Sequence, residues 1–132
     1  ADNGPMYHTP PCYTIYMAKL FLEWSKNEGG GLDKMKERNE QKAKILYDFL
    51  DSSEMFKGTV VPEDRSLMNV PFVTPSKEQD ADVVAATKTA GFDNLKGHKS
   101  VGGLRASIYN AMPVAGVQKL VEVMKAFEKE NA

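Results

Sequence analysis

Two adjacent glycines stand directly before a run of alternating residues, and this combination constrains the fold more than any other feature of the chain. Residues 104–109 place Leu104, Ala106 and Ile108 on one side and polar side chains on the other. This period of two predicts a strand with one apolar face. Because glycine accepts positive φ without a Cβ clash, Gly102 and Gly103 predict a tight bend at the start of that strand.

Cationic side chains surround this bend. His98 and Lys99 precede it, and Arg105 lies on the polar side of the strand with Ser107 and Tyr109. Backbone N–H groups that converge at a glycine turn can bind an anion, and these side chains would add donors and positive charge. The pattern therefore predicts an anion site near the start of a strand. A solvated surface loop is the competing interpretation, and the residues alone name no reaction.

The remaining elements follow from apolar periodicity and from Gly and Pro punctuation. We expect helices over 12–28, 32–52, 77–90 and from 113 to the end, and strands over 56–61, 65–74, 92–96 and 104–109. Thr9 before two prolines predicts the N-cap of the first helix, whose wide apolar stripe predicts burial on more than one side. The charged residues of the second helix, Lys42 among them, predict a solvated face. For the third helix we expect Ala81, Val84, Ala85 and Thr87 to face inward.

Helices and strands are grouped along the chain rather than strictly alternating. This grouping predicts an α+β fold with a small, mostly antiparallel sheet and helices packed on one face. Pro71 cannot donate to a sheet ladder, so its position is expected at an edge or at an unpaired site. We expect residues 1–11 to form a loop and residues 12–132 to form one small domain.

Composition excludes several classes of protein. The 132 residues are 42% hydrophobic and carry 17 basic against 18 acidic side chains, a net charge near −1. Such a balance argues against a nucleic-acid partner. No apolar run approaches the roughly 20 residues of a membrane span, and no secretory leader is visible. The single Cys12 suits a reducing compartment such as the cytoplasm. His8 and Cys12 are too few ligands to predict a metal site.

Three segments resemble one enzyme family, in the family's order. The segment from Lys96 to Pro113 resembles the C-terminal signature of the phosphoserine aminotransferases, which depend on pyridoxal phosphate. Asn3–Pro11 is similar to the family's Asn-Gly-x-x-x-Asn-Thr-Pro-Pro segment, and Arg65–Phe72 to its Arg-Ser-x-Met-Asn-Val-Pro-Phe strand. The resemblance covers nearly the whole chain but only the C-terminal part of the family's sequence.

The resemblance implies roles for five residues. Arg105 matches the arginine that binds the substrate α-carboxylate, and His98 matches the histidine for the side-chain phosphate or γ-carboxylate. Lys99 stands where many members have Arg, which keeps the charge and loses the bidentate geometry. Thr9 matches a threonine that reaches the cofactor phosphate of the neighbouring subunit, and His8 replaces the family's Asn there.

The resemblance also implies what this segment lacks. The family's cofactor-binding lysine precedes the Asn-Gly segment, so we expect no catalytic residue here and no activity from this chain alone. The whole protein would be a cytoplasmic homodimer of the serine biosynthesis pathway. It would interconvert phosphoserine and 2-oxoglutarate with 3-phosphohydroxypyruvate and glutamate. Two alternatives stay open: a free-standing anion-binding module without catalysis, and a dimerisation domain built on the apolar first helix.

Overall fold

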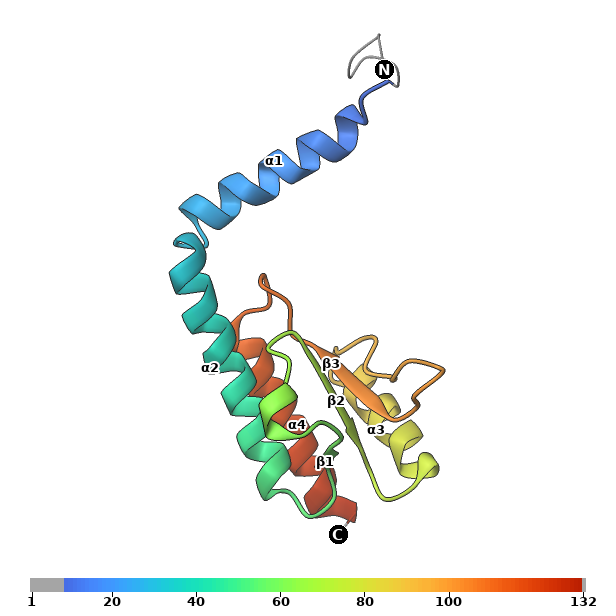
Figure 1. Cartoon of the computed structure of the whole chain (residues 1–132). Helices are drawn as coiled ribbons and strands as arrows, with labels where there is room; N and C mark the ends of the chain where they lie inside the picture. The colour runs from blue at the N-terminus through green and yellow to red at the C-terminus, as the bar shows by residue number, and fades with distance from the viewer. Residues whose placement is uncertain (1–8, 132) are drawn as a thin grey trace. The chain divides into compact units, whose positions relative to one another are not determined.

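The computed structural model describes residues 9–131, and the chain divides into two units, Ala1–Lys36 and Glu37–Ala132. Figure 1 labels the helices and strands that follow. The helices are α1 (Cys12–Asn27), α2 (Gly31–Ser52), α3 (Lys77–Thr89) and α4 (Val114–Asn131), with a 3-10 turn at Pro62–Asp64. The strands are β1 (Lys57–Gly58), β2 (Asn69–Val73) and β3 (Leu104–Ser107).

The sheet is antiparallel, with β2 between β1 and β3 (Figure 1). Val70 pairs with Ala106 and Phe72 with Leu104, and all four side chains are buried. The opposite face carries half-buried residues, among them Arg105 and Ser107. The predicted alternation of residues 104–109 is therefore confirmed.

The buried face of the sheet shares one hydrophobic core with α2, α3 and α4. The helices contribute Ala43, Leu46, Leu50, Val83, Val117, Leu120, Val121 and Met124 to this core. Burial of a Leu or Val side chain stabilises a fold by about 1.5–3 kcal/mol, so this cluster holds the helices against one face of the sheet. The α+β arrangement with helices on one face is confirmed.

The strands are shorter than the sequence predicts, because local features interrupt the extended backbone. Ser66 Oγ accepts hydrogen bonds from the N–H groups of Met68 and Asn69, so β2 begins only at Asn69. The expected strand over 92–96 is reduced to one bridge between Lys96 and Leu104. Asn94 lies in that segment with φ of 63°, which is incompatible with a continuous strand.

Pro71 lies in the central strand, β2. The expectation that Pro71 would lie in an edge strand is therefore wrong. The N–H of Arg105, the residue opposite Pro71, donates to Leu95 O at 2.7 Å and points away from β2. On the other side, β1 ends at Gly58, and Thr59, the next residue, donates its N–H to Pro71 O at 3.3 Å. The missing N–H of Pro71 therefore leaves only the reciprocal bond unmade, at the end of the pairing between β1 and β2.

Two helices bury residues other than those predicted. Lys42 is 0% exposed, whereas the sequence placed it on a solvated face of α2. In α3 the buried residues are Val83 and Thr87, while Ala81 and Ala85 are exposed. Thr87 was predicted to face inward, and its hydroxyl donates to Val83 O at 2.7 Å, which satisfies it inside the core.

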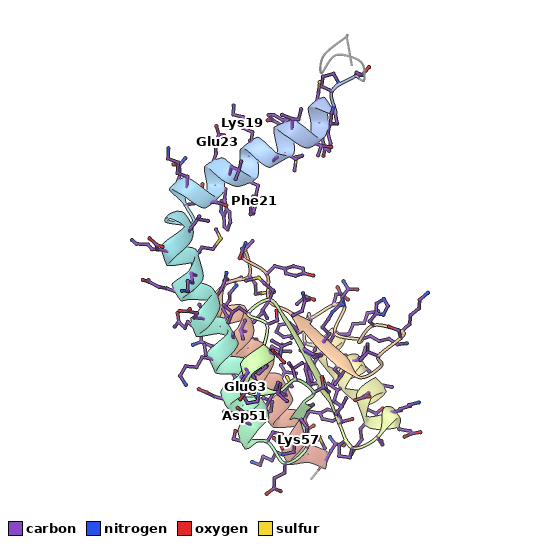
Figure 2. The ribbon with its side chains drawn as sticks, viewed as in Figure 1. Lys19, Phe21, Glu23, Asp51, Lys57 and Glu63 are labelled. Atoms are coloured by element: carbon purple, nitrogen blue, oxygen red, sulfur yellow. The ribbon has the colours of Figure 1, made fainter. Side chains whose placement is uncertain are left out.

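In the first unit, the expected burial of α1 is wrong for the chain as described. Seven large apolar side chains of α1 are 40–77% exposed: Tyr13, Ile15, Tyr16, Met17, Leu20, Phe21 and Leu22. Figure 2 shows Lys19 and Glu23, an ion pair at 3.6 Å, on the side of α1 opposite Phe21. This unit carries too few residues to bury a helix on its own. Within residues 9–131, no helix combines the length and the apolar character needed to cross a bilayer.

Candidate anion-binding site

The bend that the sequence predicts is a closed loop at the start of β3. The N–H of Gly97 donates to Gly103 O at 2.9 Å, and the N–H groups of Val101 and Gly102 both donate to His98 O, at 2.9 and 2.8 Å. Gly102 and Gly103 have φ of 77° and 64°, as expected for this bend. The loop, residues 97–103, therefore presents His98 and Lys99 on a turn fixed by its own backbone.

The hydrogen bonds of His98 leave one ring nitrogen to act as a donor. Nδ1 accepts the N–H of Ser100 at 3.3 Å and lies 2.6 Å from Ser100 Oγ. Because Nδ1 is the acceptor, the neutral imidazole carries its proton on Nε2. His98 is exposed, so Nε2–H can donate to a bound anion.

His98 and Lys99 line a hollow of about 500 Å³ together with two further lysines, Lys77 and Lys96. Its one acidic wall residue, Asp80, accepts two hydrogen bonds at Oδ1, from Thr74 N at 3.0 Å and Thr74 Oγ1 at 2.8 Å. Three ammonium groups and an imidazole around one hollow favour an anion of high charge. We call this hollow, with these three lysines and His98, the loop site.

Sequence reasoning did not predict Lys77 or Lys96 as site residues. Lys77 is the first residue of α3, which begins at the Ser76 N-cap, where Oγ accepts the N–H of Gln79 at 3.2 Å. Nothing local in the sequence indicates that α3 approaches loop 97–103. Lys96 opens the signature segment, so its place in that segment was a usable signal.

Arg105 lines a different hollow, of about 490 Å³, together with Ser107, Tyr109, Asp93 and Met112. We call it the strand site. The Arg105 side chain is half-buried, and its Nε is buried without a hydrogen-bond partner in the part of the chain that the structure describes. Within residues 9–131, no carboxylate lies within ion-pair distance of its guanidinium. Because no carboxylate among these residues pairs with its guanidinium, Arg105 is suited to bind a carboxylate supplied from outside.

The structure brings some of the predicted residues together and separates others. His98 and Lys99 share the loop site, whereas Arg105 lines the strand site. The loop site includes Gly102 and Gly103, just before β3, and the strand site is lined by residues 105–109, along β3 and past its end. A ligand that reaches all three side chains needs two anionic groups, one for each hollow.

Thr9 belongs to the first unit, and the prediction that it caps α1 is wrong. The N-cap is Pro11, and no side chain caps the helix among the described residues. Thr9 is exposed, and the first turn of α1 contains no acidic residue. An uncapped helix N-terminus with an adjacent hydroxyl is favourable for an anion. His8 lies outside the described residues. Over residues 9–131, no group of three or more His, Cys, Asp or Glu side chains is placed to hold a metal ion.

Comparison with known proteins identifies the family. The model of the class-V aminotransferase family matches residues 1–120. The chain is 52% identical over 132 residues to a phosphoserine aminotransferase of Streptococcus thermophilus and 54% identical over 131 residues to one of Bacillus cereus. Each match covers 99% of this chain and 36% of the relative, so the chain spans about a third of their length.

Solved structures agree with this result. A phosphoserine aminotransferase from Bacillus circulans superposes with a TM-score of 0.93 at 42% identity, over 99% of this chain and 36% of that one. A PLP-bound phosphoserine aminotransferase from Trichomonas vaginalis superposes with a TM-score of 0.86 at 42% identity, over 94% of this chain and 36% of that one. The three motifs, the fold and the family match agree, and the chain belongs to the class-V aminotransferase family.

Proposed function

We propose that this chain is the C-terminal portion of a phosphoserine aminotransferase and that it binds the substrate through both hollows. Phosphoserine carries an α-carboxylate and a phosphate, and glutamate carries two carboxylates. Arg105 binds the α-carboxylate that both share, and His98 and Lys99 bind the distal phosphate or γ-carboxylate. The reaction exchanges the amino group between phosphoserine and 2-oxoglutarate, giving 3-phosphohydroxypyruvate and glutamate, in serine biosynthesis.

One observation carries the proposal, namely the guanidinium of Arg105. Within residues 9–131 its Nε is buried without a hydrogen-bond partner, no carboxylate pairs with it, and the side chain lines the strand site. Arg65 Nε is likewise buried and unpaired, but Arg65 has a carboxylate partner within the chain, since Nη1 lies 2.8 Å from Asp51 Oδ2 and Nη2 lies 2.5 Å from Asp51 Oδ1. Arg65 thus stabilises the fold, whereas the guanidinium of Arg105 is placed to bind a ligand.

Pyridoxal phosphate is the cofactor that we propose for the whole protein, and it supplies the electron sink for amino-group transfer when bound. The described residues fit its phosphate group, because the exposed Thr9 adjoins the uncapped N-terminus of α1. Thr9 would donate its hydroxyl and its N–H, with His8 as a second donor. The neighbouring subunit would hold the rest of the cofactor.

The test uses the full-length protein that contains this segment. Arg105→Ala removes two charge-assisted hydrogen bonds, each worth about 1.5–3 kcal/mol, so KM for phosphoserine and for glutamate should rise by at least about 100-fold. Cofactor content should stay at the wild-type level, because Arg105 does not bind the cofactor in this proposal. Arg65→Ala is the matched control and should leave both KM values unchanged. Unchanged kinetics in Arg105→Ala would refute the assignment.

The isolated chain of 132 residues separates this proposal from a free-standing binding module. Calorimetric titration of the chain with phosphoserine should show no binding at millimolar concentration, because in this proposal the cofactor, which meets the substrate amino group, is held by the rest of the whole protein. Appreciable affinity would favour the binding module instead.

The exposed apolar side chains of α1 favour a second assignment, a homodimer with α1 at the contact between two copies. Thr9 directly precedes α1, so a contact there would bring Thr9 toward the cofactor of the neighbouring copy. Sedimentation of the full-length protein should give a dimer, and a monomer at micromolar concentration would contradict this assignment. We assign the protein to the cytoplasm, which the single exposed Cys12 suits, and cell fractionation tests it.

A further inference from the structure

A fully buried lysine lies behind the segment that carries the strand site. Lys42 on α2 is 0% exposed, and its Nζ donates to Ile108 O at 3.0 Å and to Tyr109 O at 2.6 Å. These two residues directly follow β3. Burial, and secondly the charge of Arg38, lower the pKa of Lys42 below its usual value. Burying an ammonium group costs free energy, so an apolar side chain of similar length would occupy this position at a lower cost in stability.

A second polar residue of α2 binds the same segment. Asn39, one helical turn before Lys42 and also buried, donates from Nδ2 to Asn110 Oδ1 at 2.7 Å. Two side chains on one face of α2 therefore hold three consecutive residues, 108–110, by three hydrogen bonds. We call Asn39 and Lys42 the α2 anchor.

The α2 anchor fixes the C-terminal end of the strand that carries Arg105. Arg105, Ser107 and Tyr109 all line the strand site, and Arg105 N is held at its own position by Leu95 O at 2.7 Å. The Ile108 N–H donates to Met68 O at 2.8 Å, which extends the pairing with β2 past the end of β3. An extended segment tied at both ends has little freedom to shift along its axis. The α2 anchor therefore holds the segment directly after the strand that carries Arg105.

We propose that Lys42, with Asn39, is a positioning residue for Arg105 and so for the substrate α-carboxylate. The inference rests on the proposed function, because it takes Arg105 as the carboxylate-binding residue. Lys42 touches no ligand in this account. It acts only through the carbonyl groups of residues 108 and 109.

The test compares Lys42→Met with Lys44→Met in the full-length protein. Lys44 lies on the same helix, is exposed and pairs with Asp48 at 2.6 Å, so it is a matched control. A displacement near 1 Å at a binding group reduces activity by about 100-fold, so Lys42→Met should raise KM for phosphoserine and glutamate by about 10- to 100-fold. Lys44→Met should keep the wild-type values.

The split between KM and kcat separates positioning from a merely structural role. Displacement of Arg105 weakens ground-state and transition-state binding alike, so KM rises while kcat and cofactor content stay near the wild-type level. Loss of folded protein alone would instead lower the apparent kcat and leave KM unchanged. That second pattern would overturn the proposal.

Asn39→Ala covers the case in which Lys42→Met does not fold. It removes only the hydrogen bond to Asn110 and should raise both KM values about three- to tenfold, given the worth of one buried hydrogen bond. A folded Asn39→Ala protein with wild-type KM values would also overturn the proposal.

Amide hydrogen exchange gives a readout that does not depend on activity. Peptides covering residues 104–112 should exchange faster in Lys42→Met than in wild type, and at the wild-type rate in Lys44→Met. If the wild-type protein does not turn over phosphoserine, the proposed function fails, and exchange alone decides whether Lys42 fixes this segment. Faster exchange would then support the α2 anchor, and unchanged exchange would overturn it.

Discussion

Gly97→Ala tests whether the closed loop is what holds the loop site together. A Cβ built on Gly97 would lie 2.0 Å from Gly102 O and 2.8 Å from Gly103 O. Both contacts are to backbone atoms, so no side-chain rotation relieves them. The loop must open at the point where the Gly97 N–H donates to Gly103 O.

The magnitude follows from these distances. Real Cβ contacts stay above 3.0 Å, so Gly97 and Gly102 must separate by about 1 Å. A shift of that size at His98 and Lys99 corresponds to a loss of about 100-fold in substrate use. Overpacking of this kind typically costs about 1–3 kcal/mol, but the loop is exposed and opens locally, so the melting temperature should change little.

The assay is KM for phosphoserine in the full-length protein, with Gly102→Ala as the control. Gly102 has φ of 77°, and a Cβ there meets nothing within 4 Å, so only backbone strain of about 1–2 kcal/mol opposes alanine. That strain should change KM by less than the clash at Gly97 does. If Gly97→Ala proves as mild as Gly102→Ala, the closed loop does not position His98 and Lys99.

Two further expectations concern stability. Glu128 Oε1 accepts Ser53 Oγ at 2.7 Å, Glu54 N at 2.8 Å and Met55 N at 2.9 Å. Burial raises the pKa of Glu128, but these hydrogen bonds and the charge of Lys57 lower it by more, to below its usual value. The contribution of Glu128 to folding stability is therefore fully present above its pKa in the unfolded state, near 4.5. This contribution is lost as the pH falls through its lower pKa in the folded state. Glu128→Gln should cost about 1–2 kcal/mol at pH 7 in urea unfolding and progressively less in acid, whereas the exposed Glu130→Gln should show neither effect. The control variant Arg65→Ala should lose about 1–2 kcal/mol, because Arg65 also lies 4.4 Å from the Tyr47 ring centroid; a loss near zero would remove its structural role.

Elements set by local pattern could be predicted from the sequence. The alternation at residues 104–109 gave both faces of β3 correctly, and the apolar spacing in 117–124 gave the buried face of α4. Both patterns are periodic and short in range. The strand over 92–96 failed because Asn94 adopts a left-handed conformation that its residue type permits but does not require.

Lys42 shows why burial of a polar residue was not predictable. Lys42 stands between Glu40 and Lys44 in a charge-rich stretch of the sequence, and charge runs are usually solvated. The acceptors that satisfy its ammonium are the carbonyls of residues 108 and 109, which lie 66 and 67 positions along the chain. No local pattern encodes such a pairing. The exposure of α1 has a similar origin, since its apolar spacing predicts burial, but none of the described residues of its own unit covers these side chains.

The candidate site, too, was predictable only in part. Residue type and motif placed Arg105, His98 and Lys99 at the start of one strand, but they did not indicate two separate hollows. Lys77 was missed because it reaches the loop site from α3, and Gly97 because its importance comes from a close approach rather than from a positive φ.

The proposed function gives this division of the site a physical reason. Phosphoserine and glutamate share an α-carboxylate but differ in the size and charge of the distal group. Arg105, which would meet the shared group, lies on a strand tied to Leu95, to β2 and, through residues 108–110, to α2. His98 and Lys99, which would meet the variable group, lie on an exposed loop with glycines at both ends. A strand tied at several points fixes the α-carboxylate that the substrates share, and a solvent-exposed loop closed by its own hydrogen bonds presents His98 and Lys99 to either distal anion. It follows that opening the loop should change the preference between phosphoserine and glutamate, whereas loosening β3 should weaken the binding of both alike.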